Sequence, residues 1–259
     1  MKQWFVLYQK EMLEYWRTSK WLWVPIVFIL LGVMNPITSY YMPEILKNAG
    51  GLPEGAIIEI PIPAGNEVMV QALSQYGTVG VLILVLAFMG IVSAECNSGA
   101  ASMIFVKPVR YSSYITAKWA AMMTLCTISF ALGYLFTWYY TEMLISPVDE
   151  LRILWSFMTY WIWLAFVLSL TLFFSSWLKS SGAIAFISLL CILGLSAASS
   201  LLPRFTKWSP SRLSDQAGHY LLSGETLPEG FAVFLVAGLL IVGFVTFSVY
   251  VLKKREMSH

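Results

Sequence analysis

Long uncharged apolar stretches dominate the chain and set its architecture. Each is at least as long as the roughly 20 residues that an α-helix needs to cross a bilayer. Only helices and closed barrels satisfy their backbone hydrogen bonds in lipid, so continuous runs of this length predict helices. The pattern therefore predicts an all-α integral membrane protein with six transmembrane helices. We expect them at about residues 21–42, 72–94, 117–139, 153–177, 181–202 and 230–252.

Residues 2–19 precede the first run and predict a helix of another kind. An advance of 100° per residue places its aromatic side chains and one methionine within an arc of about 120°. That arc holds Trp4, Phe5, Tyr8, Met12, Tyr15 and Trp16. An amphipathic helix of this composition is typical of the membrane interface. A plain cytosolic extension of the first span is the alternative.

Composition supports the membrane assignment. The 259 residues are 58% hydrophobic and only 12% charged, against about 25% charged in an average soluble domain. The net charge is +2, and the cations stand at the ends of the spans rather than in one patch, which argues against a nucleic-acid partner. The three cysteines, Cys96, Cys126 and Cys191, show no metal-ligand spacing.

The distribution of Lys and Arg predicts the orientation. With the N-terminus in the cytosol, eleven of the 16 cations lie inside, and the other five are Lys47, Arg152, Arg204, Lys207 and Arg212. This inside-positive bias predicts that both termini are cytosolic. We expect a multi-pass protein of the cell membrane, and specifically of the plasma membrane of a bacterium. The last outer loop, residues 203–229, is long; short helices that dip into the outer leaflet and an ordinary loop with buried anchors both fit it.

The apolar runs carry little chemistry. None of the uncharged runs, of which the third begins at Trp119 just after Lys118, contains a charged residue, and the two histidines, His219 and His259, lie outside them. Motifs for zinc or serine hydrolysis and for phosphate binding do not occur. We therefore expect no catalytic residue, no metal and no cofactor in this chain, and any ATP would be bound by another subunit. The lack of intramembrane charge also argues against a proton-driven carrier and favours an apolar or amphipathic cargo.

The loop from Glu95 to Lys118 joins the second and third runs. Asn97 or Ser98 can cap a short helix over residues 100–106, and Pro108 ends it. Such a helix across the cytosolic end of two spans can receive force from a soluble partner, whereas a turn that only joins the spans is the alternative. Glu95 either locks this loop to a neighbouring span by a salt bridge or hydrogen bond, or is a solvated interfacial charge.

This loop resembles the first cytoplasmic loop of ABC-transporter permeases of the type-2 exporter class. The resemblance rests on Glu95, Gly99, the helix at 100–106, Lys107-Pro108-Val109, Arg110, Tyr114 and Lys118. Two positions depart from the family pattern: Ala100 replaces a frequent Thr, and Arg110 stands two residues after Pro108 instead of three. The resemblance implies a permease subunit of an ATP-driven exporter, paired with a second permease chain, identical or not. A separate ABC ATPase would bind ATP and Mg.

The resemblance also implies which residues contact that ATPase. They are Glu95, Gly99, Ser102, Met103, Ile104, Phe105, Lys107, Pro108 and Arg110. Two functions from other classes stay open at this point. One is a membrane-bound regulator that holds a cytosolic factor without transport, and the other is an intramembrane enzyme.

Overall fold

The computed structural model describes residues 2–48, 63–106, 109–202, 206–227 and 230–256. All regular structure within these ranges is helical, which confirms the all-α prediction. Six helical segments are long and apolar enough to cross a membrane, so the protein is a multi-pass membrane protein. They are α2 (Lys20–Asn48), the segment Gly65–Asn97, α7 (Tyr111–Leu144), α8 (Glu150–Trp177), α9 (Ser181–Leu201) and α11 (Gly230–Glu256).

The second span is divided, although the sequence predicts one continuous helix there. It consists of α3 (Gly65–Gln75), the π-helical turn η1 (Tyr76–Gly80), α4 (Val81–Phe88) and, after a turn, α5 (Ser93–Asn97). The turn between α4 and α5 interrupts the helical hydrogen bonding. The Ser175 hydroxyl on α8 accepts hydrogen bonds there from the backbone N–H of Val92 (3.0 Å) and of Ser93 (3.3 Å). A side chain from another span thus satisfies backbone groups that lipid could not.

Two glycines allow α2 and α7 to cross at close range. A Cβ atom on Gly133 would lie 2.6 Å from the Phe28 carbonyl oxygen, and one on Gly32 would lie 2.3 Å from the Gly133 carbonyl oxygen. The Tyr76 hydroxyl donates a hydrogen bond of 3.0 Å to the same Phe28 carbonyl. Small residues let membrane helices bring their backbones together, so this crossing joins the first three spans.

Replacing Gly133 by valine is expected to destabilise the protein, because the new side chain meets backbone atoms that cannot rotate away. Overpacking of this kind costs about 1–3 kcal/mol. Thermal unfolding in detergent measures the effect. Gly243→Val on α11 is the matched control, since a Cβ there meets no atom within 4 Å. Equal unfolding temperatures for the two variants would show that the crossing is looser than the structure indicates.

Hydrogen bonds between α7 and α8 hold the centre of the bundle. Side chains at three levels pair across the two helices, and polar pairs of this kind link helices in membranes. The pairs are Trp119 Nε1 to Ser169 Oγ (2.8 Å), Trp161 Nε1 to Thr127 Oγ1 (2.8 Å), and the hydroxyls of Tyr134 and Ser156.

The connection between α9 and α11, which the sequence predicts to be the last outer loop, contains a packed helix, α10 (Arg212–Ser223). Its buried residues Leu213, Ala217 and Leu221 recur every four positions, and the helix lies against α3 and α8. Gly224 ends it in a left-handed conformation with φ of 76°. The N–H groups of Arg152 on α8 donate to the last carbonyls of α10, including Leu222 (3.1 Å).

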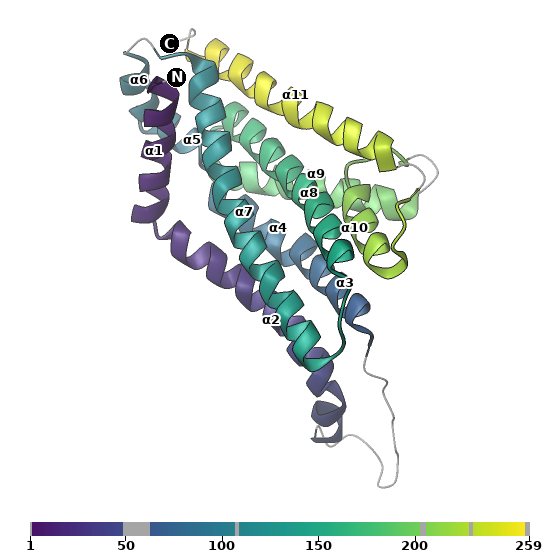
Figure 1. The fold of residues 1–259 in the computed structure, drawn as a ribbon. Helices are drawn as coiled ribbons and strands as arrows, with labels where there is room; N and C mark the ends of the chain where they lie inside the picture. The colour runs from purple at the N-terminus through teal and green to yellow at the C-terminus, as the bar shows by residue number, and fades with distance from the viewer. Residues whose placement is uncertain (1, 49–62, 107–108, 203–205, 228–229, 257–259) are drawn as a thin grey trace.

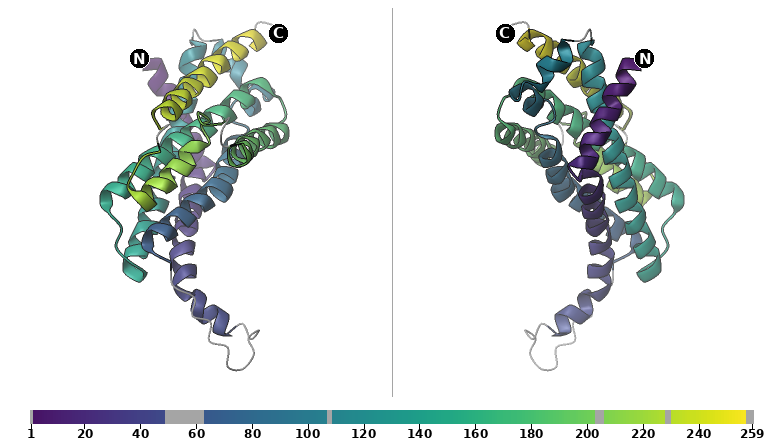
Figure 2. Two further views of the ribbon diagram at one scale, coloured as in Figure 1. Left: turned by 90° about the vertical axis from the view of Figure 1, so that its right-hand side faces the viewer. Right: turned by 90° about the vertical axis from the view of Figure 1, so that its left-hand side faces the viewer.

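The predicted N-terminal helix is present as α1 (Lys2–Arg17). Part of its aromatic arc faces α7: Trp4 Nε1 donates to Thr116 (3.1 Å), and the hydroxyls of Tyr8 and Thr124 lie 3.0 Å apart. Tyr15 is buried, whereas Phe5 and Trp16 are exposed. The arc is therefore shared between a protein contact and an outward apolar face. Figures 1 and 2 show α1, the short helix α6 and the end of α11 gathered at one end of the molecule, opposite the end of α2.

Candidate functional site: the α1–α6 end of the bundle

A short helix, α6 (Ala100–Phe105), follows α5 and leads into α7. The predicted helix at 100–106 is thus present, but neither Asn97 nor Ser98 caps it. Asn97 is the last residue of α5, Ser98 is the C-cap of that helix, and Gly99 reverses the chain with φ of 76°. A left-handed conformation of this kind suits glycine. The reversal separates α6 from the second span.

The apolar side chains of α6 divide into an outward and an inward set. Met103 is 78% exposed, and Val106, just after the helix, is 85% exposed. Phe105 instead packs against the rings of Tyr111 and Tyr114 on α7, with centroid separations of 4.5 and 5.3 Å. Phe105 therefore packs α6 against α7 of the same chain, whereas Met103 and Val106 are available for contact with another protein.

A groove of about 480 Å³ lies between α6 and α1. Met103, Ile104 and Val109 line one side of it. Gln3, Val6, Leu7 and Lys10 of α1 line the other. The groove is mostly apolar and has a single charged side chain at its wall, which is the composition expected of a surface that receives another protein's apolar residues.

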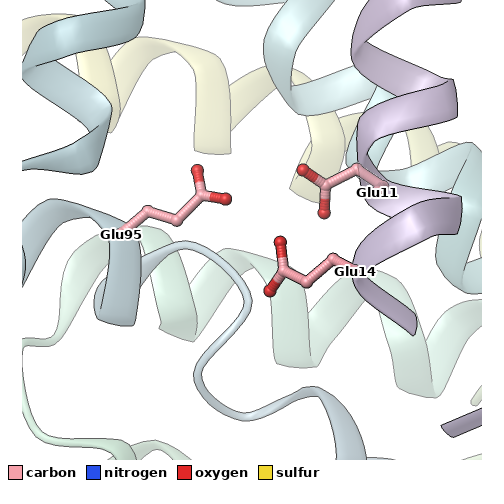
Figure 3. A group of neighbouring side chains, drawn as sticks. All are labelled: Glu11, Glu14 and Glu95. Carbon is pink, nitrogen blue, oxygen red and sulfur yellow. The ribbon is translucent and has the colours of Figure 1, made fainter. Parts of the chain in front are cut away.

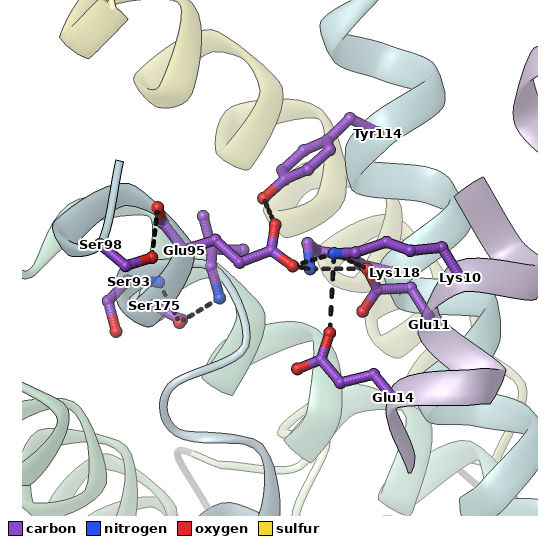
Figure 4. Close-up of polar contacts among 10 residues, drawn as sticks. Lys10, Glu11, Glu14, Ser93, Glu95, Ser98, Tyr114, Lys118 and Ser175 are labelled. Atoms are coloured by element: carbon purple, nitrogen blue, oxygen red, sulfur yellow. Dashed lines mark hydrogen bonds and ion pairs between the residues drawn. The ribbon is translucent and has the colours of Figure 1, made fainter. Parts of the chain in front are cut away.

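Glu95 lies behind α6 and joins α5 to two other helices (Figure 4). Its Oε1 is 2.9 Å from the Lys118 ammonium on α7 and also pairs with the Lys10 ammonium on α1. The Tyr114 hydroxyl donates to its other carboxylate oxygen at 2.5 Å. The predicted lock of Glu95 onto a neighbouring span is therefore confirmed, and it extends to the N-terminal helix as well.

Glu11 completes the network from α1. Its Oε1 is 2.8 Å from the Lys118 Nζ, and the two side chains are 3% and 1% exposed. Lys10 also contacts Glu11 (3.1 Å) and Glu14 (3.6 Å). Buried ions need partners because desolvation costs several kcal/mol for each charge. Helices α1, α5 and α7 are thus held in one arrangement by five charged side chains.

The pKa of Lys10 shows that this network favours the charged lysine. Burial alone lowers the pKa of the Lys10 ammonium, but Glu11 and Glu95 raise it further than burial lowers it. The net pKa lies well above the ordinary lysine value, so Lys10 is charged at any physiological pH.

The carboxylates of Glu11, Glu14 and Glu95 converge, with oxygen atoms within 4.8 Å of one another (Figure 3). Three acids at this distance are a common arrangement for a cation site. Here the Lys10 and Lys118 ammonium groups stand among them and neutralise most of their charge. The cluster is therefore an ion-pair network that joins helices, and it does not call for a metal ion.

The chain is 38% identical over 225 residues to the uncharacterized transmembrane protein YxlG of Bacillus subtilis (strain 168), and the match covers 87% of each chain. The chain belongs to the YxlG family. No family model matches the sequence. The description of YxlG as a transmembrane protein agrees with the six spans of this chain.

In this YxlG-family chain, most of the predicted coupling residues lie at one end of the bundle. Glu95 is on α5, Gly99 forms the turn, and Arg110 is the exposed N-cap residue of α7. Lys107 and Pro108 lie outside the described residues. Helix α6 carries the remaining four, Ser102, Met103, Ile104 and Phe105.

The sequence pointed to neither Lys10 nor Glu11 as a functional residue. A signal for Glu11 exists, because an advance of 100° per residue places it only about 20° from Trp4, at the edge of the aromatic arc. A carboxylate at the border of a buried helix face requires a cation from another element. Lys118, at the start of the third predicted span, is the cation that could have been predicted to pair with Glu11.

Proposed function

We propose that the protein is the transmembrane permease subunit of an ATP-driven ABC exporter, which docks on a separate ATPase subunit through α6. The observation that carries the proposal is the pairing of an outward apolar surface with a rigid base. Met103 and Val106 project from α6, and the network of Lys10, Glu11, Glu95 and Lys118 binds the region behind them to α1 and α7.

The mechanism follows from that arrangement. Closure of the ATPase pair on ATP pushes on α6. Phe105 passes the push to Tyr111 and Tyr114 at the start of α7, and the ion pairs pass it to α1. Since α1 leads directly into α2, three helices move together. ATP and Mg remain on the partner, and this chain supplies positioning and motion.

Other parts of the proposal concern orientation, assembly and cargo. The inside-positive bias supports cytosolic termini, which places α6 where an ATPase can reach it. A second permease chain, identical or not, completes the membrane dimer. The spans have uncharged apolar cores, which favours an apolar or amphipathic cargo taken from the bilayer.

Site-specific photo-crosslinking in native membranes tests the proposal. A photoreactive residue at Val106 is expected to capture a subunit that carries nucleotide-binding motifs, and the purified complex is expected to show vanadate-sensitive ATP hydrolysis. The same residue at Trp208, exposed in the connection between α9 and α10, serves as the control. Capture at Val106 of a stable partner without a nucleotide site would replace the exporter by a membrane-bound regulator.

A further inference from the structure

A second groove lies between the ends of α8 and α11, and it shares no lining residue with the groove between α1 and α6. Its volume is about 710 Å³. Four aromatic side chains form its apolar part: Phe173 and Trp177 on α8, and Phe247 and Tyr250 on α11. Their rings contact one another in series, with centroid separations of 6.1 Å for Phe173 and Trp177, 5.5 Å for Phe173 and Phe247, and 5.9 Å for Phe247 and Tyr250.

Three cations complete the wall of this groove: Lys179, Lys254 and Arg255. None of the described residues that line it is acidic, so the lining has a formal charge of +3. The ion-pair network at Glu95 uses other lysines, Lys10 and Lys118. The ammonium groups of Lys179 and Lys254 are therefore not neutralised by the carboxylates that brace α6.

The position of these side chains matches the layers of a bilayer. Phe173 and Phe247 lie within two membrane spans, and the three cations stand at or just beyond the ends of those spans. Trp177 and Tyr250, near the same ends, are of the residue types that favour the level of lipid headgroups. An apolar wall at acyl-chain depth below a cluster of cations at headgroup depth is complementary to an anionic phospholipid.

We propose that this groove binds one anionic phospholipid, with its phosphate among Lys179, Lys254 and Arg255 and an acyl chain along Phe173 and Phe247. The site also connects to the proposed coupling region. Asn97 of α5 donates from Nδ2 to the Lys179 carbonyl (2.7 Å) and accepts at Oδ1 from the Arg255 guanidinium (3.4 Å). A lipid held by this groove therefore stabilises the segment that carries α6. The proposal does not depend on the exporter function.

Native mass spectrometry of the full chain in mixed micelles of phosphatidylglycerol and phosphatidylcholine tests the site. The wild-type protein is expected to retain phosphatidylglycerol in preference to phosphatidylcholine. Each cation near a membrane surface contributes about fivefold to such binding, so Lys179→Gln with Lys254→Gln is expected to lower retention about 25-fold. The matched control is Arg17→Gln with Lys253→Gln. It removes the same charge from exposed positions outside the groove lining and is expected to keep the preference.

Several outcomes would overturn the lipid site. Equal losses in the two double variants would show that only net charge attracts the lipid. Displacement of the lipid by inorganic phosphate would show a phosphate site without a role for the aromatic wall. If the wild-type protein is a dimer without bound lipid, and the Phe247→Asn variant is a monomer, a second copy of the chain covers the groove.

Discussion

Replacing Lys118 by methionine is expected to lower the free energy of unfolding by about 3–5 kcal/mol, the range measured when one partner of a buried ion pair is removed. The Lys118 side chain is 1% exposed, and its ammonium lies 2.8 Å from Glu11 and 2.9 Å from Glu95. Methionine keeps an unbranched apolar stem but leaves both carboxylates with Lys10 as their remaining cation. Lys10 is 40% exposed and also neutralises Glu14, so it cannot compensate.

Thermal unfolding in detergent measures this effect, with a thiol-reactive fluorophore reporting exposure of the buried Cys126 of α7 in a protein whose partly exposed Cys96 and Cys191 are replaced by alanine. Lys253→Met, at the exposed end of α11, is the control and is expected to unfold like the wild type. Adding Glu11→Gln to Lys118→Met is expected to recover part of the stability, because one unpaired carboxylate is removed. If Lys118→Met and Lys253→Met unfold at the same temperature, the network does not brace α6.

If the protein docks on an ATPase subunit as proposed, replacing both Met103 and Val106 by glutamate is expected to release that subunit from this chain. The two side chains are exposed apolar groups at the groove between α1 and α6. Burying a carboxylate in a desolvated contact costs more free energy than burying the apolar side chain it replaces would gain. A central interface residue contributes about 2 kcal/mol or more, so the loss of even one of the two contacts is expected to lower the affinity by about thirtyfold. Membrane insertion is unaffected because neither residue lies in a span.

Quantitative co-purification at matched expression measures the loss, with Met103→Leu and Val106→Ile together as the control that preserves the apolar surface. Full cargo-linked ATP hydrolysis by the glutamate variant would contradict the docking site. Phe105→Asp, which the sequence alone suggests, is a poorer test. Its ring packs on Tyr111 and Tyr114, so this change would weaken the chain's own packing as well as any partner contact.

The sequence predicted the spans well because their signal is local. A run of uncharged residues can satisfy its backbone in lipid only as a helix, so each run fixes its own structure. All the spans except α9 are longer than the predicted runs, however. At 1.5 Å per residue, the 34 residues of α7 extend about 51 Å, beyond the roughly 30 Å of the hydrocarbon core. The first two turns of α7, which end at Lys118, belong to this extension.

The features that the sequence did not reveal depend on distant residues. Glu11 and Lys118 are 107 positions apart, and Lys10 and Glu95 are 85 apart. No local pattern reports such a pair. Helix α6 shows the same limit at short range, since a six-residue helix has too few positions to tell which of its apolar side chains face inward. Glu95 and Lys118 belong to the same loop segment, so their contact could have been predicted from the sequence.

The π-helical turn η1 sets the rotational phase of the second span. Along this span, buried residues recur at every fourth position: Ala72, Tyr76, Gly80, Leu84 and Phe88. In a continuous α-helix this spacing would drift by about 40° per step and carry Phe88 about 160° away from Ala72. The wide turn absorbs about one residue, or roughly 100° of that drift. Deleting one residue of η1 would therefore turn α4 about its axis and direct its buried side chains, such as Leu84 and Phe88, away from the helices they now contact.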